Sequence, residues 1–544
     1  MTIKIINYKQ DDRLNISLPL IVGEVFPGGD STIEILNKAL SAESVIWPVL
    51  NGRFKVLVHL KPGENKIGFK YKDHILDFNL IYEPLKFKRF IRLVYIKCKD
   101  DEGRFQAPPE ENNSIYSACN RIRLGARMLQ TFTGDKIGDH KLQRKTFCLE
   151  ENNGDVICHV FTSSLTLNEA YKLNDEQLWS NFAVELMNSN LRVNNDCKFL
   201  AFLSFTRYHN NTMSPPRNYK EILQMTKGQV ALGGGGLALF GSGCLHTWPE
   251  NLHEVPWRFG DKRRIDRMQF MDDSANRGWY WACYSTGLGA TLHELGHTFD
   301  LGHTKSGIMG RGFDDIYKYF IVDMFYHDHM FQKLYNPYYQ VSSVQNCTVS
   351  LSPTSPVSWE PEIETPLYNL HFQNINDSTQ SKEKVNSNNL THNRDTVSSR
   401  MLKDGEVPWR SPNPPDVYYN DPNLAVNVGG AFWARSSALL LYYHRWFNDK
   451  DEKEEAMISF DGMKLSSSHG IRIVEFRDAE GTSCHHIEFL EGEKKTVDLS
   501  LCDISEYASD RTQTVSFVAE DSMGNVFKSK LDITQLLFKK NQTV

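Results

Sequence analysis

Hydrophobic and polar residues alternate in the first part of the chain, which predicts strands rather than helices. Every second position is apolar on either side of a Pro-Gly-Glu-Asn turn at residues 62–65, namely Phe54, Val56, Val58 and Leu60 before it and Ile67, Phe69 and Tyr71 after it. Period-two patterning across a turn is typical of a β-hairpin. We therefore expect residues 1–86 to form a small all-β, sandwich-like domain.

The pattern becomes mixed after residue 86. Residues 90–96 (FIRLVYI) and 199–205 (FLAFLSF) are apolar runs typical of buried strands. Residues 113–132 repeat apolar positions at helical spacing, and a Thr-Gly-Asp sequence at 133–135 predicts the end of that helix. A further helix is expected with its N-terminal cap at residues 285–287. Together these elements predict an α+β domain over residues 87–345.

The rest of the chain divides into a polar segment and a second β-rich part. Residues 346–414 are expected to be a linker, and residues 374–400 within it are too poor in apolar side chains to bury a core, so we expect them to be disordered. Short strands are expected at residues 471–476, 486–489 and 514–518. They predict a second β-sandwich-like domain over residues 415–544.

Composition narrows the class of protein. Hydrophobic residues make up 40% of the 544 residues, which is ample for packed cores, and the net charge of -6 gives no reason to expect a nucleic-acid partner. The first residues lack a basic region followed by an apolar run, so no signal peptide is expected. No stretch is long and apolar enough to predict membrane insertion. We expect a cytoplasmic protein, with access to the nucleus left open; the oligomeric state is not indicated.

One short motif carries two candidate metal ligands and an acid. The sequence His293-Glu294-Leu295-Gly296-His297 follows the pattern HExxH. Residues i and i+4 lie on one face of a helix, so His293 and His297 can direct one nitrogen each at a single ion. A catalytic zinc site has three protein ligands and leaves a fourth position for water. Glu294 is suited to take a proton from that water as a general base.

His303 is the candidate third ligand. It reaches the same ion only if the chain turns back after His297, and such a turn usually requires a residue that adopts a left-handed conformation. The turn position holds Asp300, and Asp is one of the few residues other than Gly that adopt this conformation. Gly302 adds conformational freedom to the same turn.

These motifs resemble the metzincin clan of zinc peptidases. The sequence HELGHTFDLGHT at residues 293–304 is followed by SGIMGRGFDD at residues 306–315. The clan pattern is HExxHxxGxxH followed by a Met-turn beneath the metal, and only Asp300, in place of Gly, departs from it. The resemblance covers roughly residues 87–336. The wider chain resembles a group of zinc metallopeptidases found in fungi and animals.

The resemblance implies an α/β metzincin-like catalytic domain with flanking β-domains. It implies a zinc-dependent metalloendopeptidase with one zinc ion per chain, Glu294 as the catalytic base and Met309 in the Met-turn. It also implies an antiparallel edge strand that binds a peptide or protein substrate as an added strand. Our candidate for this edge is the Gly-rich segment from Leu232 to Phe240, and within it Gly235, Gly236, Leu237, Ala238 and Leu239.

Two other functions remain open. A zinc amidohydrolase that does not act on peptides would use the same site chemistry. A peptide-binding scaffold that retains zinc without turnover is a second alternative, although the intact Glu294 argues against it.

Several weaker signals favour structural explanations. The Gly run lacks the Gly-Lys-Ser/Thr of a phosphate-binding loop. The remaining signals are two Cys/His groupings at residues 244–246 and 484–486, a basic cluster at residues 262–267, and two tyrosines, Tyr317 and Tyr319, at a position where some metzincins place a Tyr that assists the transition state.

Overall fold

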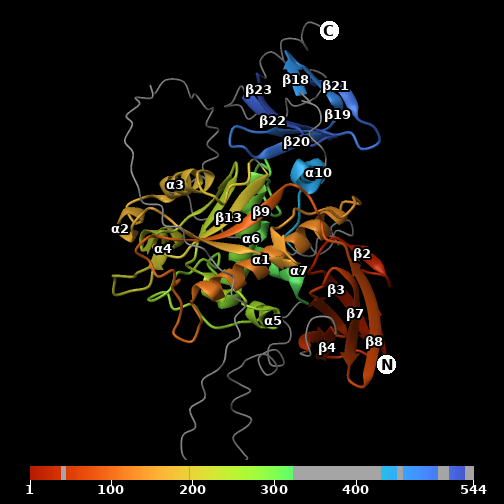
Figure 1. The fold of residues 1–544 in the computed structure, drawn as a ribbon, viewed down its shortest axis with the longest axis vertical. Coiled ribbons are helices and arrows are strands. Elements are labelled where there is room, and N and C mark those ends of the chain that lie inside the picture. Colours follow the sequence, from red (N-terminus) through yellow and green to blue (C-terminus); the bar gives the residue numbers. More distant parts are fainter. Residues whose placement is uncertain (38–43, 195, 323–429, 450–457, 500–513, 533–544) are drawn as a thin grey trace, which may run out of the picture. The chain divides into compact units, whose positions relative to one another are not determined.

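The computed structural model describes residues 1–37, 44–194, 196–322, 430–449, 458–499 and 514–532. The predicted linker 346–414, including its segment 374–400, lies outside the described residues. Mixed sheets and helices make this an α+β protein, as the sequence predicts (Figure 1). None of the described helices combines the length and hydropathy needed to cross a membrane.

The N-terminal residues form one eight-stranded sheet in the order β1-β3-β6-β5-β4-β7-β8-β2. Its strands are β1 (Thr2–Ile5), β2 (Asp12–Leu14), β3 (Leu20–Phe26), β4 (Ser31–Asn37), β5 (Val45–Leu50), β6 (Arg53–Leu57), β7 (Gly63–Tyr71) and β8 (His74–Tyr82). The predicted hairpin between β6 and β7 was wrong, because β6 pairs with β3 and β5 whereas β7 pairs with β4 and β8. Alternation correctly indicated strands but carries no information about their partners.

A five-stranded sheet lies at the centre of the next part, in the order β12-β9-β13-β17-β16. Its strands are β9 (Phe90–Lys97), β12 (Cys158–Thr162), β13 (Cys197–Leu203), β16 (Ala231–Gly234) and β17 (Leu237–Gly241). The first four strands in this order run parallel, and β16 pairs antiparallel with β17. The antiparallel strand is therefore at one edge.

Helices cover both faces of this sheet. Helix α3 (Asp175–Met187) buries Leu178 and Phe182 against one face, while α1 (Ile115–Gly138) and α6 (Tyr280–Thr298) pack on the other (Figure 1). The predicted end of α1 at residues 133–135 was wrong, and the helix continues to Gly138. Gly134 is tolerated inside it because a side chain there would crowd Ile16 of the N-terminal part, with 3.0 Å between the added Cβ and Ile16 Cδ1.

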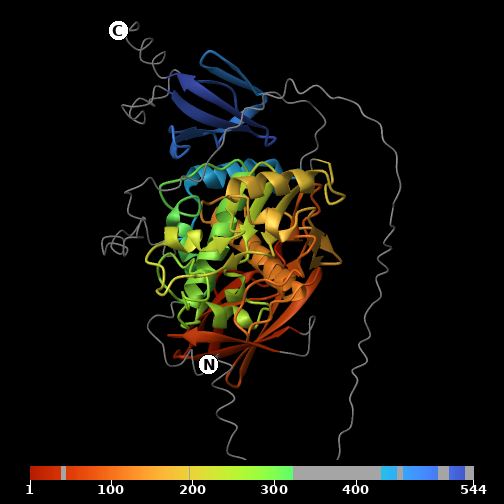
Figure 2. The same cartoon turned by 90° about the vertical axis from the view of Figure 1, so that its left-hand side faces the viewer.

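The C-terminal residues form a six-stranded sheet built around one long strand, β19, shown in blue in Figure 2. Its strands are β18 (Ile458–Asp461), β19 (Lys464–Arg477), β20 (Ser483–Glu488), β21 (Lys494–Asp498), β22 (Thr514–Asp521) and β23 (Val526–Asp532). Strand β19 pairs with β18, β20, β21 and β22. Helix α10 (Arg435–Tyr443) precedes this sheet in the chain.

Shorter elements complete the described fold. They are β10 (Glu151–Asn152), β11 (Asp155–Val156), α2 (Leu167–Ala170), β14 (Arg207–Tyr208), α4 (Tyr219–Gln224), β15 (Thr226–Lys227), η1 (Leu245–Thr247), α5 (Glu254–Phe259), η2 (Arg311–Asp315), α7 (Tyr317–Phe320) and η5 (Arg445–Phe447).

Candidate active site

Helix α6 carries the HExxH motif near its C-terminal end. It begins at Tyr280, so the cap predicted at residues 285–287 was wrong. Ser285 lies inside the helix, where its hydroxyl donates to the carbonyl oxygen of Asp314 at 2.6 Å. The helix begins one turn before Ser285 because the side chains of Tyr280, Trp281 and their neighbours are buried.

The three predicted ligands meet at one place. His293 and His297 lie one turn apart on α6, with 3.1 Å between their Nε2 atoms. The ring centroid of His303 lies 5.3 Å from that of His293 and 4.8 Å from that of His297. The ligand atoms of all three lie within 4.8 Å of one another. Two nitrogens of a tetrahedral zinc site are roughly 3.3 Å apart, so the donor set fits one zinc ion.

Hydrogen bonds orient the two helical ligands. His293 Nδ1 donates to the carbonyl oxygen of Ile308 at 2.7 Å, and His297 Nδ1 donates to that of Leu301 at 2.9 Å. With the proton on Nδ1, the lone pair is on Nε2 and faces the place where the three rings meet. Main-chain carbonyls outside the motif therefore determine the tautomer that metal binding requires.

Burial keeps the three rings neutral. It lowers the pKa of His293 well below its usual range, and the neighbouring His297 lowers it further. Burial and the nearby His303 lower the pKa of His297 to about 4. Burial, followed by the charge of Arg477, also lowers the pKa of His303. Neutral imidazoles at physiological pH are the form that binds a metal ion.

The turn between His297 and His303 has the conformation that the sequence predicts. Asp300 has a φ of 66°, in the left-handed region. The chain reverses tightly there, and the N–H of Leu301 donates back to the carbonyl of Gly296 at 3.2 Å. This reversal brings His303 to the other two ligands.

Met309 lies directly beneath the helical ligands. Its side chain is completely buried. A Cβ added to Gly296, between the two helical ligands, would lie 2.6 Å from Met309 Sδ, so the thioether packs against the helix backbone at this point. The preceding residue, Ile308, supplies the carbonyl that orients His293. Met309 thus lies where a Met-turn would lie.

Glu294 belongs to helix α6 and faces strand β16 across a close backbone contact. Burial raises the pKa of its carboxyl group to about 8, and a hydrogen bond from the main-chain N–H of Gly233 opposes that rise. A divalent cation held by the three histidines would favour the ionised carboxylate. The acid is therefore placed next to the metal ligands with one donor already directed at it.

The free sheet edge lies in the first part of the segment selected from the sequence, one strand before the five residues named there. Gly235 and Gly236 form the turn between β16 and β17, and Leu237, Ala238 and Leu239 belong to β17. Strand β17 pairs on both sides and its three residues are buried, so it has no free edge. Among the described strands, none pairs with the outer side of β16. Residues 231–234 therefore present the edge.

Tyr317, Tyr319 and His246, which were weaker sequence signals, make structural contacts within the fold. Tyr319 donates its hydroxyl to Asp135 Oδ2 at 2.6 Å, and Tyr317 packs edge-on against Trp281 with 4.9 Å between ring centroids. His246 is fully buried between aromatic rings. In the described part of the chain, the His triad is the only group of three or more side chains that could hold a metal ion.

The basic cluster at residues 262–267 is largely neutralised. Arg263 pairs with Asp261 at 2.6 Å, Arg267 pairs with Asp272 at 2.6 Å, and Arg264 lies over the ring of Trp279. These contacts favour a structural role for the cluster.

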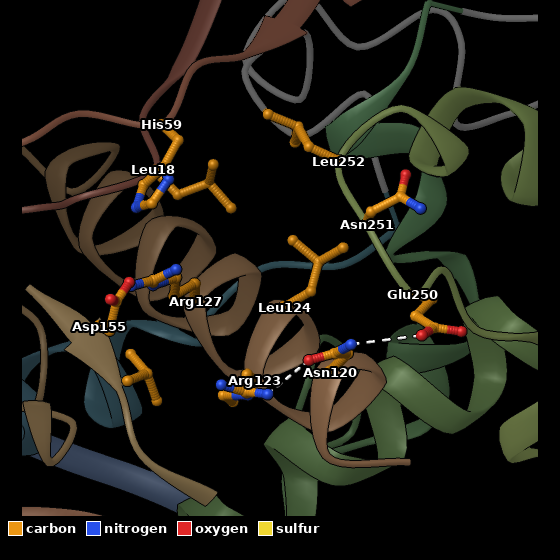
Figure 3. Close-up of a pocket in the computed structure, with 11 residues that line it drawn as sticks. Leu18, His59, Asn120, Arg123, Leu124, Arg127, Asp155, Glu250, Asn251 and Leu252 are labelled. Carbon is orange, nitrogen blue, oxygen red and sulfur yellow. Dashed lines mark hydrogen bonds between the residues drawn. The ribbon is translucent and has the colours of Figure 1, made fainter. Parts of the chain in front are cut away.

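A separate pocket of about 220 Å³ opens beside α1 (Figure 3). None of the metal-site residues lines it. Charged side chains of both signs line the pocket, including Arg123, Arg127 and Glu250. Asn120 donates a hydrogen bond to Glu250 Oε1 at 3.3 Å. Arg127 donates to the carbonyl oxygen of Gly154 at 2.7 Å.

Two residues that the sequence did not single out support the site. Gly233 donates to Glu294, and Ile308 accepts from His293. Ile308 precedes the predicted Met-turn residue, but its role depends on a main-chain carbonyl, which has no sequence signature. Gly233 belongs to the Gly run, which gave a signal without indicating which Gly mattered.

The chain is similar in sequence to one protein family and to two fungal proteins. A family model described as "Putative peptidase family" matches residues 2–401. A protein of Schizosaccharomyces pombe named as a putative zinc metalloproteinase is 29% identical over 332 residues, covering 56% of this chain and 52% of that protein. A Saccharomyces cerevisiae protein with the same description is 28% identical over 326 residues, covering 54% and 45%. The chain spans about half the length of the curated relatives it matches.

A comparison with solved structures gives a weaker likeness. The crystal structure of OgpA from Akkermansia muciniphila is 12% identical, covering 82% of this chain and 94% of that chain, with a TM-score of 0.38. Because the family model matches well over half of the chain, this protein belongs to the Putative peptidase family.

Proposed function

We propose that this protein is a zinc-dependent endopeptidase of the metzincin type. His293, His297 and His303 would hold one zinc ion per chain, and Glu294 would act as the general base. The single observation that carries the proposal is the convergence of three histidines, two of which direct Nε2 at the meeting point, beside Glu294. Membership in a peptidase family supports a peptide bond as the target.

Zinc, when bound, supplies a Lewis acid that polarises a carbonyl group and acidifies a bound water. Glu294 accepts the proton from the attacking water and later donates it to the leaving amine. Its buried position favours proton exchange near neutral pH, because burial raises the pKa of the carboxyl group while a nearby cation lowers it.

We propose that β16 binds the substrate as an added antiparallel strand. None of the described strands pairs with its outer side, and Gly233 within it lies against Glu294, so an added strand would run beside the proposed base. This moves the proposed edge from residues 235–239 to residues 231–234. The antiparallel direction of β16 within an otherwise parallel sheet agrees with the edge strand implied by the metzincin resemblance.

We further propose that the catalytic domain spans residues 87–345, with β-domains at residues 1–86 and 415–544 on either side. The eight-stranded and six-stranded sheets fall within these flanking ranges. Their proposed role is to position the protein or its substrate.

The proposed function is tested by unbiased cleavage profiling. Purified wild type and Glu294→Ala, each analysed for zinc, are incubated with a proteome-derived peptide library, and new termini are identified by mass spectrometry. We expect new termini with the wild type alone, at equal zinc content. Turnover of small amides without peptide cleavage would favour a non-peptidase amidohydrolase. Zinc binding without any cleavage would favour a peptide-binding scaffold.

A further inference from the structure

The turn that brings His303 to the metal site is held from outside the predicted catalytic domain. Lys528 of β23 places its Nζ 2.6 Å from Asp300 Oδ1. His444, which follows α10, places its Nε2 3.3 Å from Asp300 Oδ2. Both carboxylate oxygens of Asp300, at the tip of the turn, therefore have a partner in the C-terminal part of the chain.

The main chain of the same turn is held as well. Arg477, the last residue of β19, donates from its guanidinium group to the carbonyl oxygen of Asp300 at 2.6 Å. The Arg477 side chain is 10% exposed and also binds Glu475 Oε1 at 2.8 Å, so its orientation is restricted. Gly302 lies directly against it, since an added Cβ would be 2.5 Å from Arg477 Nε.

His303 itself is attached to the C-terminal sheet through its backbone. The N–H of Ser483, the first residue of β20, donates to the carbonyl oxygen of His303 at 2.7 Å. His303 and Thr482 form an isolated parallel bridge. The backbone of the third proposed ligand is thus attached to the β19–β20 connection through a single bridge.

The three ligands differ in how they are oriented. His293 and His297 belong to a helix, and each ring donates to a main-chain carbonyl. Within the described residues, no hydrogen bond to a protein group is found for the ring of His303. The direction of this ring therefore depends mainly on its backbone, and the backbone is held by Arg477 and Ser483.

We infer that the C-terminal sheet completes the metal site by holding the Asp300–His303 turn, with Arg477 and Lys528 as positioning residues. The inference rests on the proposed function, because it requires that the His triad binds zinc. It assigns the C-terminal sheet a role in metal affinity, in addition to the proposed role of positioning the protein or its substrate. Residues that orient metal ligands typically change metal affinity by about 10- to 100-fold when they are replaced.

The test uses the full chain with Arg477→Met and Lys528→Met. Arg472→Met is the control for the first, because Arg472 lies on the same strand and contacts Phe489 and Glu493 instead of the turn. Lys530→Met is the control for the second, two residues further along β23. Zinc affinity is measured by chelator competition, the visible spectrum of the cobalt-substituted protein reports the coordination geometry, and thermal unfolding of the metal-free protein reports the stability.

We expect Arg477→Met to weaken zinc binding by about 10- to 100-fold and to change the cobalt spectrum in the direction of His303→Ala. Lys528→Met should weaken binding by several-fold, and both controls should match the wild type. A purely structural role would lower the unfolding temperature of the metal-free protein and leave the cobalt spectrum unchanged, which would overturn the inference.

Two further outcomes are decisive. If Arg477→Met does not fold, Lys528→Met decides the question, because the Lys528 side chain is 48% exposed and its loss should leave the fold intact. Wild-type affinity in that variant then overturns the inference. A wild type that binds no zinc, or a His303→Ala variant that retains full affinity, would instead overturn the proposed metal site itself.

Discussion

Gly233 packs directly against Glu294, so that strand β16 and helix α6 touch backbone to backbone at the proposed catalytic acid. A Cβ added to Gly233 would lie 1.9 Å from the carbonyl oxygen of Glu294 and 2.8 Å from its Cα. Both atoms belong to the helix main chain and cannot move aside alone. Only a residue without a side chain permits the proposed substrate edge to lie this close to the acid.

Gly233→Ala should therefore separate β16 from α6. We expect it to destabilise the protein by about 1–3 kcal/mol, the usual cost of overpacking, and to reduce peptidase activity more than stability alone explains. Gly236→Ala is the matched control, because nothing lies within 4 Å of a Cβ added at that turn residue. Thermal unfolding and kcat/KM measure the two effects. Equal behaviour of the two variants would contradict the close packing.

Met309 should contribute packing beneath the site rather than metal binding. Met309→Leu nearly conserves the volume, so we expect it to cost less than about 1.5 kcal/mol and to leave zinc affinity unchanged. Met309→Ala should cost about 2–5 kcal/mol, because the side chain is completely buried. Denaturant unfolding and zinc titration check both. Loss of zinc in Met309→Leu would indicate a more direct role for the sulfur.

Removal of zinc should lower the stability of the wild type more than it lowers the stability of a variant that lacks one of the three histidines. A ligand that binds only the folded state stabilises it by about 4 kcal/mol when present at a thousandfold excess over its Kd. We expect chelation to lower the Tm of the wild type and to have little effect on His293→Ala or His303→Ala. Full zinc content in His303→Ala would point to Asp300 or a distant carboxylate as the third ligand.

Acid should destabilise the protein partly through Glu111. Burial opposes ionisation of this carboxyl group, yet the hydrogen bond and charge of Arg258, with the charges of Arg121 and Arg263, lower its pKa to about 2. Arg258 binds both carboxylate oxygens at 2.7 Å. A depressed pKa stabilises the folded state above the ordinary value of 4.5, and this stabilisation is lost as the pH falls from 4.5 towards 2.

Glu111→Gln should therefore flatten the loss of stability between pH 4.5 and 2, as measured by the free energy of unfolding across that range. At neutral pH it should cost about 3–5 kcal/mol, because buried arginines lose their counter-charge. Glu110→Gln, whose parent side chain is 43% exposed, is the control. An unchanged acid slope in Glu111→Gln would remove this carboxylate from the pH dependence.

The convergence of the three histidines could be predicted from the sequence because their spacing is local. His293 and His297 are separated by one helical turn, and the left-handed conformation that His303 requires is accessible to Asp300. Both features depend on neighbouring residues, whose geometry does not vary with the rest of the fold. Of the strands that alternation predicts at residues 53–60 and 67–71, the second forms in full and the first forms as far as Leu57, for the same reason.

Features that depend on distant segments could not be predicted in this way. The partners of β6 and β7 are set by the placement of β4 and β5 between them, and a period-two pattern does not encode that placement. The Gly run contains both the edge strand and its turn, and only the pairing of β17 with β13 shows that the edge is at residues 231–234. The contacts of Lys528 and Arg477 with Asp300 join residues far apart in the chain.

The ratio of kcat/KM between the wild type and Glu294→Gln, measured on one cleaved peptide at equal zinc occupancy, most directly tests whether Glu294 activates water beside the His triad. We predict that Glu294→Gln binds zinc like the wild type and loses about 10²- to 10⁴-fold in kcat/KM, the usual contribution of a general base. Equal kcat/KM in the two proteins at equal zinc content would contradict the proposed mechanism.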